Sequence, residues 1–223
     1  IEPQNVRQGA FVLFCSYAWF PENTVFCAVV DPGVGSDRKA ICIKTRDYVF
    51  VGPDNGILWE AANADGIEQI IQLENPDFFL SCISNTFHGR DVFAPVCAHI
   101  SKGMNDLRAL GRQRKTCREY EFEKVHDSGQ VIKLSVLHID RFGNIVLNLT
   151  RDRFEKMIKG GRFIIKVRNV TVKNCYPTYA AAKKNELFLI SGSHPFMEIS
   201  LKNASAAQRI GISCTDALTL MLQ

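Results

Sequence analysis

Two ionisable side chains flank a turn at which a rigid scaffold could present them to a ligand. Asp31 follows the apolar run 24–30 and enters a turn with two glycines, which would let the backbone approach a ligand closely. Arg38 could fold back over this turn and keep the Asp31 carboxylate ionised and oriented. Aspartate often only caps such a turn, and a lone Asp–Arg pair is more often a surface ion pair than a site. The Gly-x-Gly at 33–35 lacks the full dinucleotide fingerprint, so we predict no Rossmann nucleotide site.

A third side chain, His88, lies in a short polar loop just before an apolar helix. Thr86, Arg90 and Asp91 share this loop, and the N–H groups of a helix start favour an anion or carboxylate. Histidine titrates near neutral pH and can donate or accept a proton. A lone histidine is more often a satisfied structural residue, but the polar loop around it favours function. No histidines have metal-ligand spacing, so we expect no catalytic metal.

The second half of the chain holds a different kind of candidate site. Asp140, Phe142 and Asn144 combine a carboxylate, an aromatic ring and an amide in one tight turn. These groups could stack on a purine and hydrogen-bond to it, although Asp, Gly and Asn are also ordinary turn residues. Residues 191–195 and 198–206 form a similar loop and strand with polar ends.

Apolar periodicity divides the chain into two regions. Helical and strand-like segments alternate in the first half, which is therefore predicted to be an α/β domain. The nearly continuous apolar run 24–30 indicates a strand buried on both faces, as in a mainly parallel sheet. Helices are predicted at 4–19, 57–63 and 91–102, and further strands at 40–44, 48–52 and 67–73.

After about residue 118 the pattern changes to short strands separated by turn residues. These strands are predicted at 131–139, 145–149, 163–167, 170–174, 187–191 and 197–201. Such spacing is typical of a small β-barrel or sandwich. We therefore predict an N-terminal α/β domain at 1–118 and a smaller C-terminal β-barrel domain at 119–223.

Composition limits the possible partners. The chain has 223 residues, 46% of them hydrophobic and 22% charged, with a net charge of +4. The basic run 108–118 lacks interleaved aromatic residues, so an exposed face is favoured over a nucleic-acid site. The sequence has no stretch that approaches 18 apolar residues, so no membrane span is expected. The eight cysteines include no Cys-x-x-Cys pair, which argues against a zinc ribbon. Cys27, Cys42 and Cys97 lie in apolar runs and are interpreted as small buried side chains in a reducing cytoplasm.

Several segments together resemble one enzyme family. The chain is similar to the S-adenosylmethionine hydrolases that release adenosine, a family that also contains the fluorinase and chlorinase halogenases. The matching segments occur in the family's order and span nearly the whole chain: 3–6, 20–25, 29–38, 51–56, 86–95, 139–144 and 198–206.

The resemblance implies a fold, an assembly and a set of site residues. It implies an α/β domain and a smaller β-barrel, in a homotrimer whose sites lie between subunits. The family's Asp-Arg-His set falls on Asp31, Arg38 and His88. No cofactor is implied, because S-adenosylmethionine is the substrate. The implied substrate-binding positions are Asp140, Phe142, Asn144, Ser193, Glu198 and the backbone near Ala204.

The implied reaction is attack of water on C5′ of the ribose. The sulfonium makes this carbon electrophilic, and methionine leaves as a neutral thioether. Positioning a water in line with the C5′–S bond can supply much of the barrier reduction. Asp31, oriented by Arg38, and His88 could orient the water and take its proton, and the sequence leaves open which group is the base.

Two features depart from the family pattern. The family begins with a strand and a helix that carry ribose-binding aspartates, and this sequence begins beyond them, so the N-terminal domain is expected to lack both elements. In addition, His194 and Pro195 occupy a loop that handles the amino-acid end of the substrate in relatives.

Two other functions compete with hydrolysis. Halogenases of the family carry a hydroxyl side chain at the position of Gly89 and a tyrosine at that of Asp31, and they have a long insertion near 45–48. The differences at all three places argue against halogenation. The other alternative is a protein that binds adenosine or S-adenosylmethionine without turnover, against which the intact Asp31, Arg38 and His88 argue.

Overall fold

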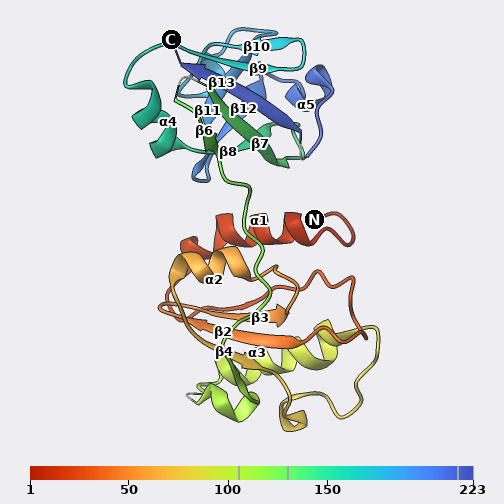
Figure 1. The fold of residues 1–223 in the computed structure, drawn as a ribbon. Coiled ribbons are helices and arrows are strands. Elements are labelled where there is room, and N and C mark those ends of the chain that lie inside the picture. Colours follow the sequence, from red (N-terminus) through yellow and green to blue (C-terminus); the bar gives the residue numbers. More distant parts are fainter. Residues whose placement is uncertain (105, 130, 215, 223) are drawn as a thin grey trace. The chain divides into compact units, whose positions relative to one another are not determined.

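The chain folds into two compact units, Ile1–Glu121 and Phe122–Gln223, each with its own sheet (Figure 1). The structure is a computed structural model that describes residues 1–104, 106–129, 131–214 and 216–222. Within these ranges, no helix combines the length and apolar character needed to cross a membrane.

The N-terminal unit is built on a five-stranded sheet with strand order β1-β3-β2-β4-β5. Only the β1–β3 pair is parallel, while β3–β2, β2–β4 and β4–β5 are antiparallel. The predicted mainly parallel sheet is therefore not confirmed. The chain passes from β2 to β3 through three residues, and so short a turn can join only antiparallel neighbours. The strands are β1 (Val25–Cys27), β2 (Ala40–Thr45), β3 (Val49–Pro53), β4 (Ile67–Gln72) and β5 (Gln113–Arg114).

β1 is shorter and less buried than the apolar run 24–30 predicted. Cys27 is exposed, so the prediction of a strand buried on both faces is wrong for this segment. Beyond β1 the backbone stays beside β3, because the Ala28 N–H donates to the Val51 carbonyl at 3.0 Å. The Asn55 side-chain amide then donates to the Val30 carbonyl at 2.8 Å. These two bonds hold the segment that leads into Asp31 against the sheet.

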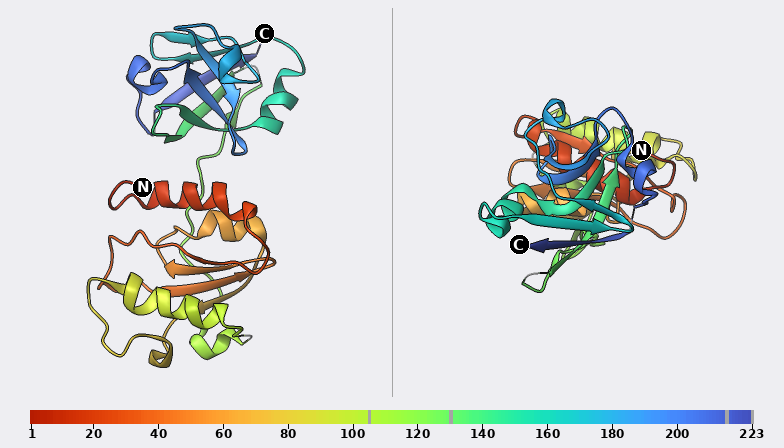
Figure 2. Two further views of the ribbon diagram at one scale, coloured as in Figure 1. Left: turned by 180° about the vertical axis from the view of Figure 1, so that it is seen from behind. Right: turned by 90° about the horizontal axis from the view of Figure 1, so that it is seen from above.

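Helices cover both faces of this sheet (Figures 1 and 2). α1 (Val6–Ser16) and α2 (Trp59–Asp65) lie on one face, where their apolar residues pack on Ile41, Ile43 and Phe50. α3 (Ala94–Ser101) covers the other face together with the π-helical turn η3 (Gly89–Phe93). The predicted helices at 4–19, 57–63 and 91–102 are thus present, with shifted ends. Short 3-10 turns complete the unit: η1 (Tyr17–Trp19), η2 (Pro76–Phe78) and η4 (Leu107–Leu110).

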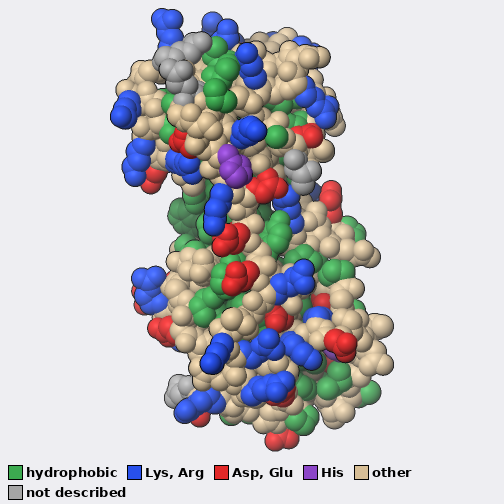
Figure 3. Space-filling model, in the orientation of Figure 1, with side chains coloured by type: hydrophobic (Ala, Val, Ile, Leu, Met, Phe, Trp, Pro, Cys, Tyr) green, Lys and Arg blue, Asp and Glu red, His purple; other side chains and the backbone are tan. Residues whose placement is uncertain are grey.

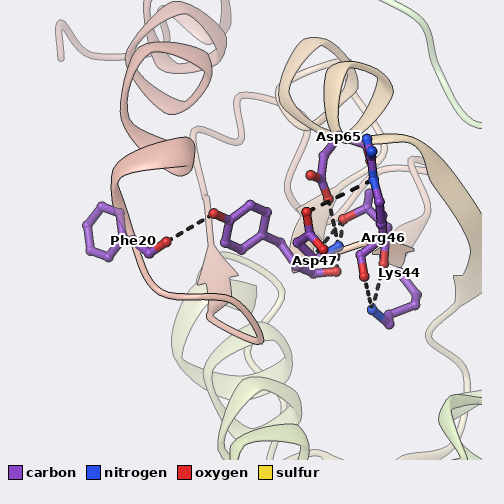
Figure 4. Close-up of polar contacts among 7 residues, drawn as sticks. Phe20, Lys44, Arg46, Asp47 and Asp65 are labelled. Carbon is purple, nitrogen blue, oxygen red and sulfur yellow. Dashed lines mark hydrogen bonds and ion pairs between the residues drawn. The ribbon is translucent and has the colours of Figure 1, made fainter.

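A partly buried hydrogen-bond network fixes the turn between β2 and β3 (Figure 4). The Asp65 carboxylate accepts from the Asp47 N–H at 3.0 Å, and the Arg46 guanidinium donates to the Asp65 carbonyl at 2.9 Å. The Tyr48 hydroxyl donates to the Phe20 carbonyl at 3.0 Å. The C-terminal end of α2 and the end of η1 are therefore both tied to one β-turn, which aligns the helical layer with the sheet.

The basic run 108–118 contributes to a charged face of the N-terminal unit. Figure 3 shows Lys and Arg side chains gathered there among acidic ones. Arg112 pairs with Glu74 at 3.2 Å, and Arg114 donates to the Gln72 side chain at 2.9 Å. Arg112 and Arg114 therefore each have an acidic or polar side chain as a partner on this face.

The C-terminal unit is an antiparallel sheet that closes nearly into a barrel. Its order is β10-β9-β13-β7-β8-β12-β11, and β6 pairs with β7. The two end strands meet where Leu189 of β11 donates its N–H to the Asn174 carbonyl at 2.8 Å, just beyond β10. Its strands are β6 (His126–Asp127), β7 (Val131–Ile139), β8 (Ile145–Thr150), β9 (Phe163–Val167), β10 (Val170–Val172), β11 (Leu187–Ser191), β12 (Phe196–Leu201) and β13 (Ala217–Leu222).

The sheet of the C-terminal unit surrounds a large apolar core, and a smaller buried cluster of Ala182, Phe188 and Ile190 lies apart from it. Ile145, Leu147 and Leu149 of β8 are fully buried in the large core, and Phe154 of α4 (Arg151–Ile158) closes one side. α5 (Ala206–Ile210) packs on the same core. The six strands predicted for this half are present, whereas α4, α5, β6 and β13 were not predicted.

Candidate active site

Arg38 joins the two parts of the predicted Asp-Arg-His set. Its Nε lies 2.9 Å from each carboxylate oxygen of Asp31, and its Nη2 also donates to Asp31 Oδ2. The same Nη2 lies 2.9 Å from Nδ1 of His88. The structure therefore brings together a carboxylate, a guanidinium and an imidazole that are up to 57 positions apart in the sequence.

The contact with Arg38 determines how His88 is protonated. A guanidinium has only N–H donors, so Nδ1 of His88 must act as the acceptor in this contact. The neutral imidazole then carries its proton on Nε2. His88 consequently presents an N–H donor on the side of the ring that faces away from Arg38.

The ion pair lies largely out of solvent. The side chains of Arg38 and Asp31 are 11% and 6% exposed, and the Arg38 guanidinium lies over the Phe93 ring at 5.2 Å from its centre. Charges in such a setting interact more strongly than in water, and removing one partner leaves the other uncompensated. Val29 and Phe87 are exposed apolar residues on the same two loops.

Close contact between two loops creates this arrangement. Gly35 has φ of +77°, and a β-carbon there would lie 2.5 Å from the carbonyl oxygen of Asn85. Only glycine combines that backbone conformation with so short an approach. The turn is closed further by Ser36, whose hydroxyl donates to the Gly33 carbonyl at 2.6 Å. The loop that starts at Asp31 can therefore pack directly on the loop that leads to His88.

A buried carboxylate anchors the loop that carries His88. Asp91 is fully buried, and its Oδ2 accepts from the Ser84 N–H at 2.8 Å. Its Oδ1 accepts from Arg90 Nε at 2.6 Å, and this hydrogen bond, with the one from Ser84, lowers the pKa of Asp91. Asp91 thus holds both ends of the loop, and His88 sits at the start of η3 in a fixed backbone position.

The predicted purine-binding turn is present at the start of β8. The Asp140 Oδ1 accepts from the N–H groups of Phe142 and Asn144 at 2.9 and 2.8 Å, and its Oδ2 accepts from the Asn144 side-chain amide at 2.8 Å. Asp140 therefore uses both oxygens to shape the turn. Phe142 is 80% exposed in this turn, and Asn144 is buried.

The turn is held against the segment that carries Ala204. The Ala207 N–H donates to the Gly143 carbonyl at 2.9 Å, and Gly143, with φ of +82°, leaves room for Ser205 to pack where a side chain would overlap. Ala204 is exposed beside this contact. The structure thereby brings the predicted groups at 140–144 and 204 together.

Glu198 and Ser193 lie on and beside β12. Ser193 is exposed in the loop before the strand, whereas Glu198 is buried. The Tyr179 hydroxyl donates to Glu198 Oε2 at 3.0 Å, and His194 Nε2 lies 3.2 Å from Oε1. Sequence reasoning missed Tyr179 because it follows no motif and lies in η5 (Tyr179–Ala181), a short turn between strands.

Comparison with known proteins assigns the chain to a family. The family model of the SAM hydroxide adenosyltransferase N-terminal domain matches residues 1–111, and the model of the C-terminal domain of the same family matches residues 134–219. The chain belongs to this family. The site residues of the N-terminal unit and those of the C-terminal unit therefore belong to the two characteristic domains of SAM hydroxide adenosyltransferases.

Individual proteins are similar to this chain over most of its length. The (R)-S-adenosyl-L-methionine hydrolase of Methanocaldococcus jannaschii is 33% identical over 99% of this chain and 80% of its own. A crystal structure of an uncharacterized conserved protein from Thermotoga maritima superposes with a TM-score of 0.91, with 32% identity over 99% of this chain and 86% of that chain. A fluorinase from Actinopolyspora mzabensis is more distant, at 22% identity over 70% of this chain and 60% of its own.

The tautomer of His88 can be measured directly. We expect nitrogen-15 NMR of the protein near pH 7.5 to show the His88 ring protonated at Nε2, with Nδ1 unprotonated. The signals can be assigned by comparison with a His88→Gln variant. In an Arg38→Ala variant the preference for this tautomer should weaken, because the donor to Nδ1 is gone. A ring protonated at Nδ1 in the unaltered protein would contradict the geometry.

Proposed function

We propose that the protein hydrolyses S-adenosylmethionine to adenosine and methionine. The observation that carries this proposal is the Arg38 bridge between the Asp31 carboxylate and His88 Nδ1. It holds the Asp31 carboxylate, an acceptor, and the His88 ring, which carries an Nε2–H donor, on one guanidinium. We infer that these two side chains together orient the attacking water. The related S-adenosyl-L-methionine hydrolase supports the choice of substrate.

The bonding of Asp31 points to its role in the proposed reaction. Oδ2 accepts two hydrogen bonds from Arg38 and Oδ1 accepts one, so Oδ1 retains acceptor capacity for a water proton. The water oxygen attacks C5′ of the ribose while the C5′–S bond breaks and sulfur keeps the electron pair. As the new C–O bond forms, the attacking oxygen becomes acidic, and Asp31 takes its proton. His88 Nε2–H holds the water oxygen in line.

The C-terminal unit supplies the groups proposed to bind the substrate. The exposed Phe142 ring offers a stacking surface for adenine, and base stacking on an aromatic ring contributes about 1–3 kcal/mol. Asn144 and the backbone near Ala204 are proposed to bind the nucleoside polar atoms. Ser193 is proposed to bind the amino-acid end, with Glu198 as a further residue of the site.

We also propose that the protein is a cytoplasmic homotrimer in which each site lies between subunits. The proposed catalytic residues lie in one unit of the chain and the proposed substrate-binding residues in the other. Sites shared between subunits would give trimerisation a direct catalytic role. The unpaired thiols of all eight cysteines fit a reducing compartment.

Halogenation is disfavoured by the residues beside the catalytic set. Gly89 has no hydroxyl to replace the hydration shell of a halide ion, although a β-carbon there would meet no atom closer than 3.8 Å. Incubation with fluoride or chloride should therefore yield no 5′-halo-adenosine.

The second candidate function is a protein that binds S-adenosylmethionine without turnover. Calorimetric binding of S-adenosylmethionine without formation of products would favour it.

Replacing Asp31 tests the proposed base. Asp31→Asn should lower turnover of S-adenosylmethionine by about 100-fold or more, the range expected for loss of a general base. Adenosine affinity should change little, because the proposed adenosine-binding groups lie in the C-terminal unit. Chromatography for adenosine and methionine measures turnover, with both sulfonium epimers as substrates.

Asp37→Asn is the matched control for this test, because Asp37 is an exposed aspartate on the same loop. It should retain normal turnover. Full activity in Asp31→Asn would remove the proposed role of Asp31, and absence of products with the unaltered protein would reject hydrolysis.

Complementation tests whether sites lie between subunits. Asp31→Ala subunits should be inactive alone, and Phe142→Ala subunits should have low activity alone at a substrate concentration far below their raised KM. Co-expressed in one cell, they should form mixed trimers in which some sites combine two intact halves, so that part of the activity returns. The mass by light scattering should be three times the 25.1 kDa of one chain. No recovered activity in confirmed mixed assemblies would contradict a shared site.

A further inference from the structure

The loop that carries His88 contains a second ion pair, to which the proposed reaction assigns no role. Arg90 Nε donates to Asp91 Oδ1 at 2.6 Å, and Arg90 Nη2 donates to Asp91 Oδ2 at 3.1 Å. The Asp91 side chain has no exposed surface, whereas the Arg90 side chain is 58% exposed. Two parallel hydrogen bonds fix an arginine and a carboxylate in one mutual geometry. Arg90 therefore closes the buried carboxylate on its solvent side.

Asp91 is the residue through which the loop is held together. Its Oδ2 also accepts from the Ser84 N–H at 2.8 Å, seven residues back in the chain. Its carbonyl accepts from the Leu80 N–H at 2.9 Å, and its own N–H donates to the Phe87 carbonyl at 3.2 Å. One residue is thus bonded to the loop at its beginning, at its middle and at the position just before His88.

Ser84 connects Asp91 to the other loop of the site, which starts at Asp31. The residue after Ser84 is Asn85, and a β-carbon at Gly35 would lie 2.5 Å from its carbonyl oxygen. Because Asp91 fixes Ser84, it also fixes the backbone surface on which Gly35 packs. The same buried carboxylate therefore supports both loops that meet at the proposed catalytic set.

Arg90 also covers an aromatic ring of its own loop. Its guanidinium lies over the Phe87 ring, at 5.1 Å from the ring centre. The Arg38 guanidinium lies over the Phe93 ring in the same way, at 5.2 Å. A cation over the face of an aromatic ring is attracted to it. Arg90 therefore holds Phe87 as well as Asp91, and an Asp–Arg–Phe group occurs twice at this site.

The backbone after His88 has a conformation that needs such support. The turn η3 is π-helical, and the Ala94 N–H donates to the Gly89 carbonyl, five residues back. Turns of this kind are rare and are found frequently at functional sites. Asp91 is the middle residue of η3, so its bonds to Ser84 and Arg90 hold the turn whose first residue follows His88.

We propose that Asp91 and Arg90 are positioning residues for the proposed reaction. Their ion pair sets the contact between the Arg38 guanidinium and His88 Nδ1, and thereby the place of the ring that orients the attacking water. This inference rests on the proposed function. Position 91 requires a carboxylate, because an asparagine there would keep an oxygen for the Ser84 N–H but turn its NH₂ group toward Arg90, which only donates.

The same unit of the chain contains a matched control pair. Arg108 Nε donates to Asp106 Oδ1 at 3.0 Å, and the Arg108 N–H donates to the same oxygen at 3.1 Å. The two side chains are 71% and 62% exposed, and Asp106 caps η4, which lies on neither loop of the site. If loss of a local Asp–Arg pair were sufficient, both pairs would give the same effect.

Kinetics and nitrogen-15 NMR of the full chain test the role of Asp91. Asp91→Asn should lower kcat for S-adenosylmethionine by about 10- to 100-fold, because a displacement of about 1 Å at reacting groups has an effect of this size. KM should change little, since the groups proposed to bind adenosine lie in the C-terminal unit. The His88 ring should also lose its preference for protonation at Nε2. Asp106→Asn should change neither property.

Substitution of Arg90 tests the pair from its exposed side. Arg90→Gln should lower kcat and weaken the tautomer preference of His88, because the buried carboxylate then lacks its forked donor. Arg90→Lys should restore part of kcat, since lysine keeps the charge but not the two parallel bonds. The double variant of Arg90→Gln and Asp91→Asn should lose less than the product of the two single losses, because both changes break one pair.

The outcomes separate this proposal from the proposed hydrolysis. Normal kcat and an unchanged His88 tautomer in a folded Arg90→Gln or Asp91→Asn variant would overturn it, and thermal melting identifies the folded variants. A lower kcat with an unchanged tautomer, or equal losses in Asp106→Asn, would also overturn it. If the unaltered protein does not turn over S-adenosylmethionine, hydrolysis is rejected, and the NMR comparison alone decides whether the pair sets the contact at His88.

Discussion

The bridge made by the Arg38 guanidinium constrains the N-terminal site more than any other contact. Because arginine only donates, it orients the carboxylate of Asp31 and also selects which nitrogen of His88 carries the proton. Gly35 and the buried Asp91 position the two loops that carry the side chains of this bridge. Gly35 allows the first loop to touch the backbone of the second, and Asp91 ties the second to its own helix.

The C-terminal unit uses its carboxylates in the same way, as supports. Asp140 shapes the turn that exposes Phe142, and Glu198 holds the hydroxyl of Tyr179. In both cases a buried or internally bonded acid places an aromatic ring at the surface. Charged groups so arranged cost less than isolated buried charges, because each oxygen already has a donor. Asp140 and Glu198 were predicted to contact the substrate, but in the structure their oxygens bond within the unit.

Local patterns were sufficient to predict most of the elements but not their pairing. The apolar run 24–30 indicated a buried parallel strand. Only Val25–Cys27 is a strand, however, and Cys27 is exposed. Its burial depends on which strands lie beside it, and periodicity carries no information about neighbours. α4 was missed because its sequence is mostly charged and Phe154 is its one fully buried residue. Strand β13 was missed although its sequence is apolar.

The site residues also fall into those that sequence patterns could predict and those that depend on contacts in the folded chain. Asp31, Arg38 and His88 could be selected because they belong to ordered segments that resemble one family, and the structure brings their side chains together. Tyr179 could not be selected as a partner of Glu198, because the hydrogen bond between them spans 19 positions and its ring packs on Phe188 only in the folded chain. The roles of Asp140 and Glu198 likewise depend on donors that only the folded chain supplies.

The central claim is that a water molecule held beside Asp31 and His88 attacks the ribose carbon. Turnover of S-adenosylmethionine in ¹⁸O-labelled water, followed by mass spectrometry of the products, tests it most directly. The account predicts one heavy oxygen in adenosine, at the 5′ position, and none in methionine. Adenosine without the label, or heavy oxygen in the amino-acid product, would contradict attack of water at C5′.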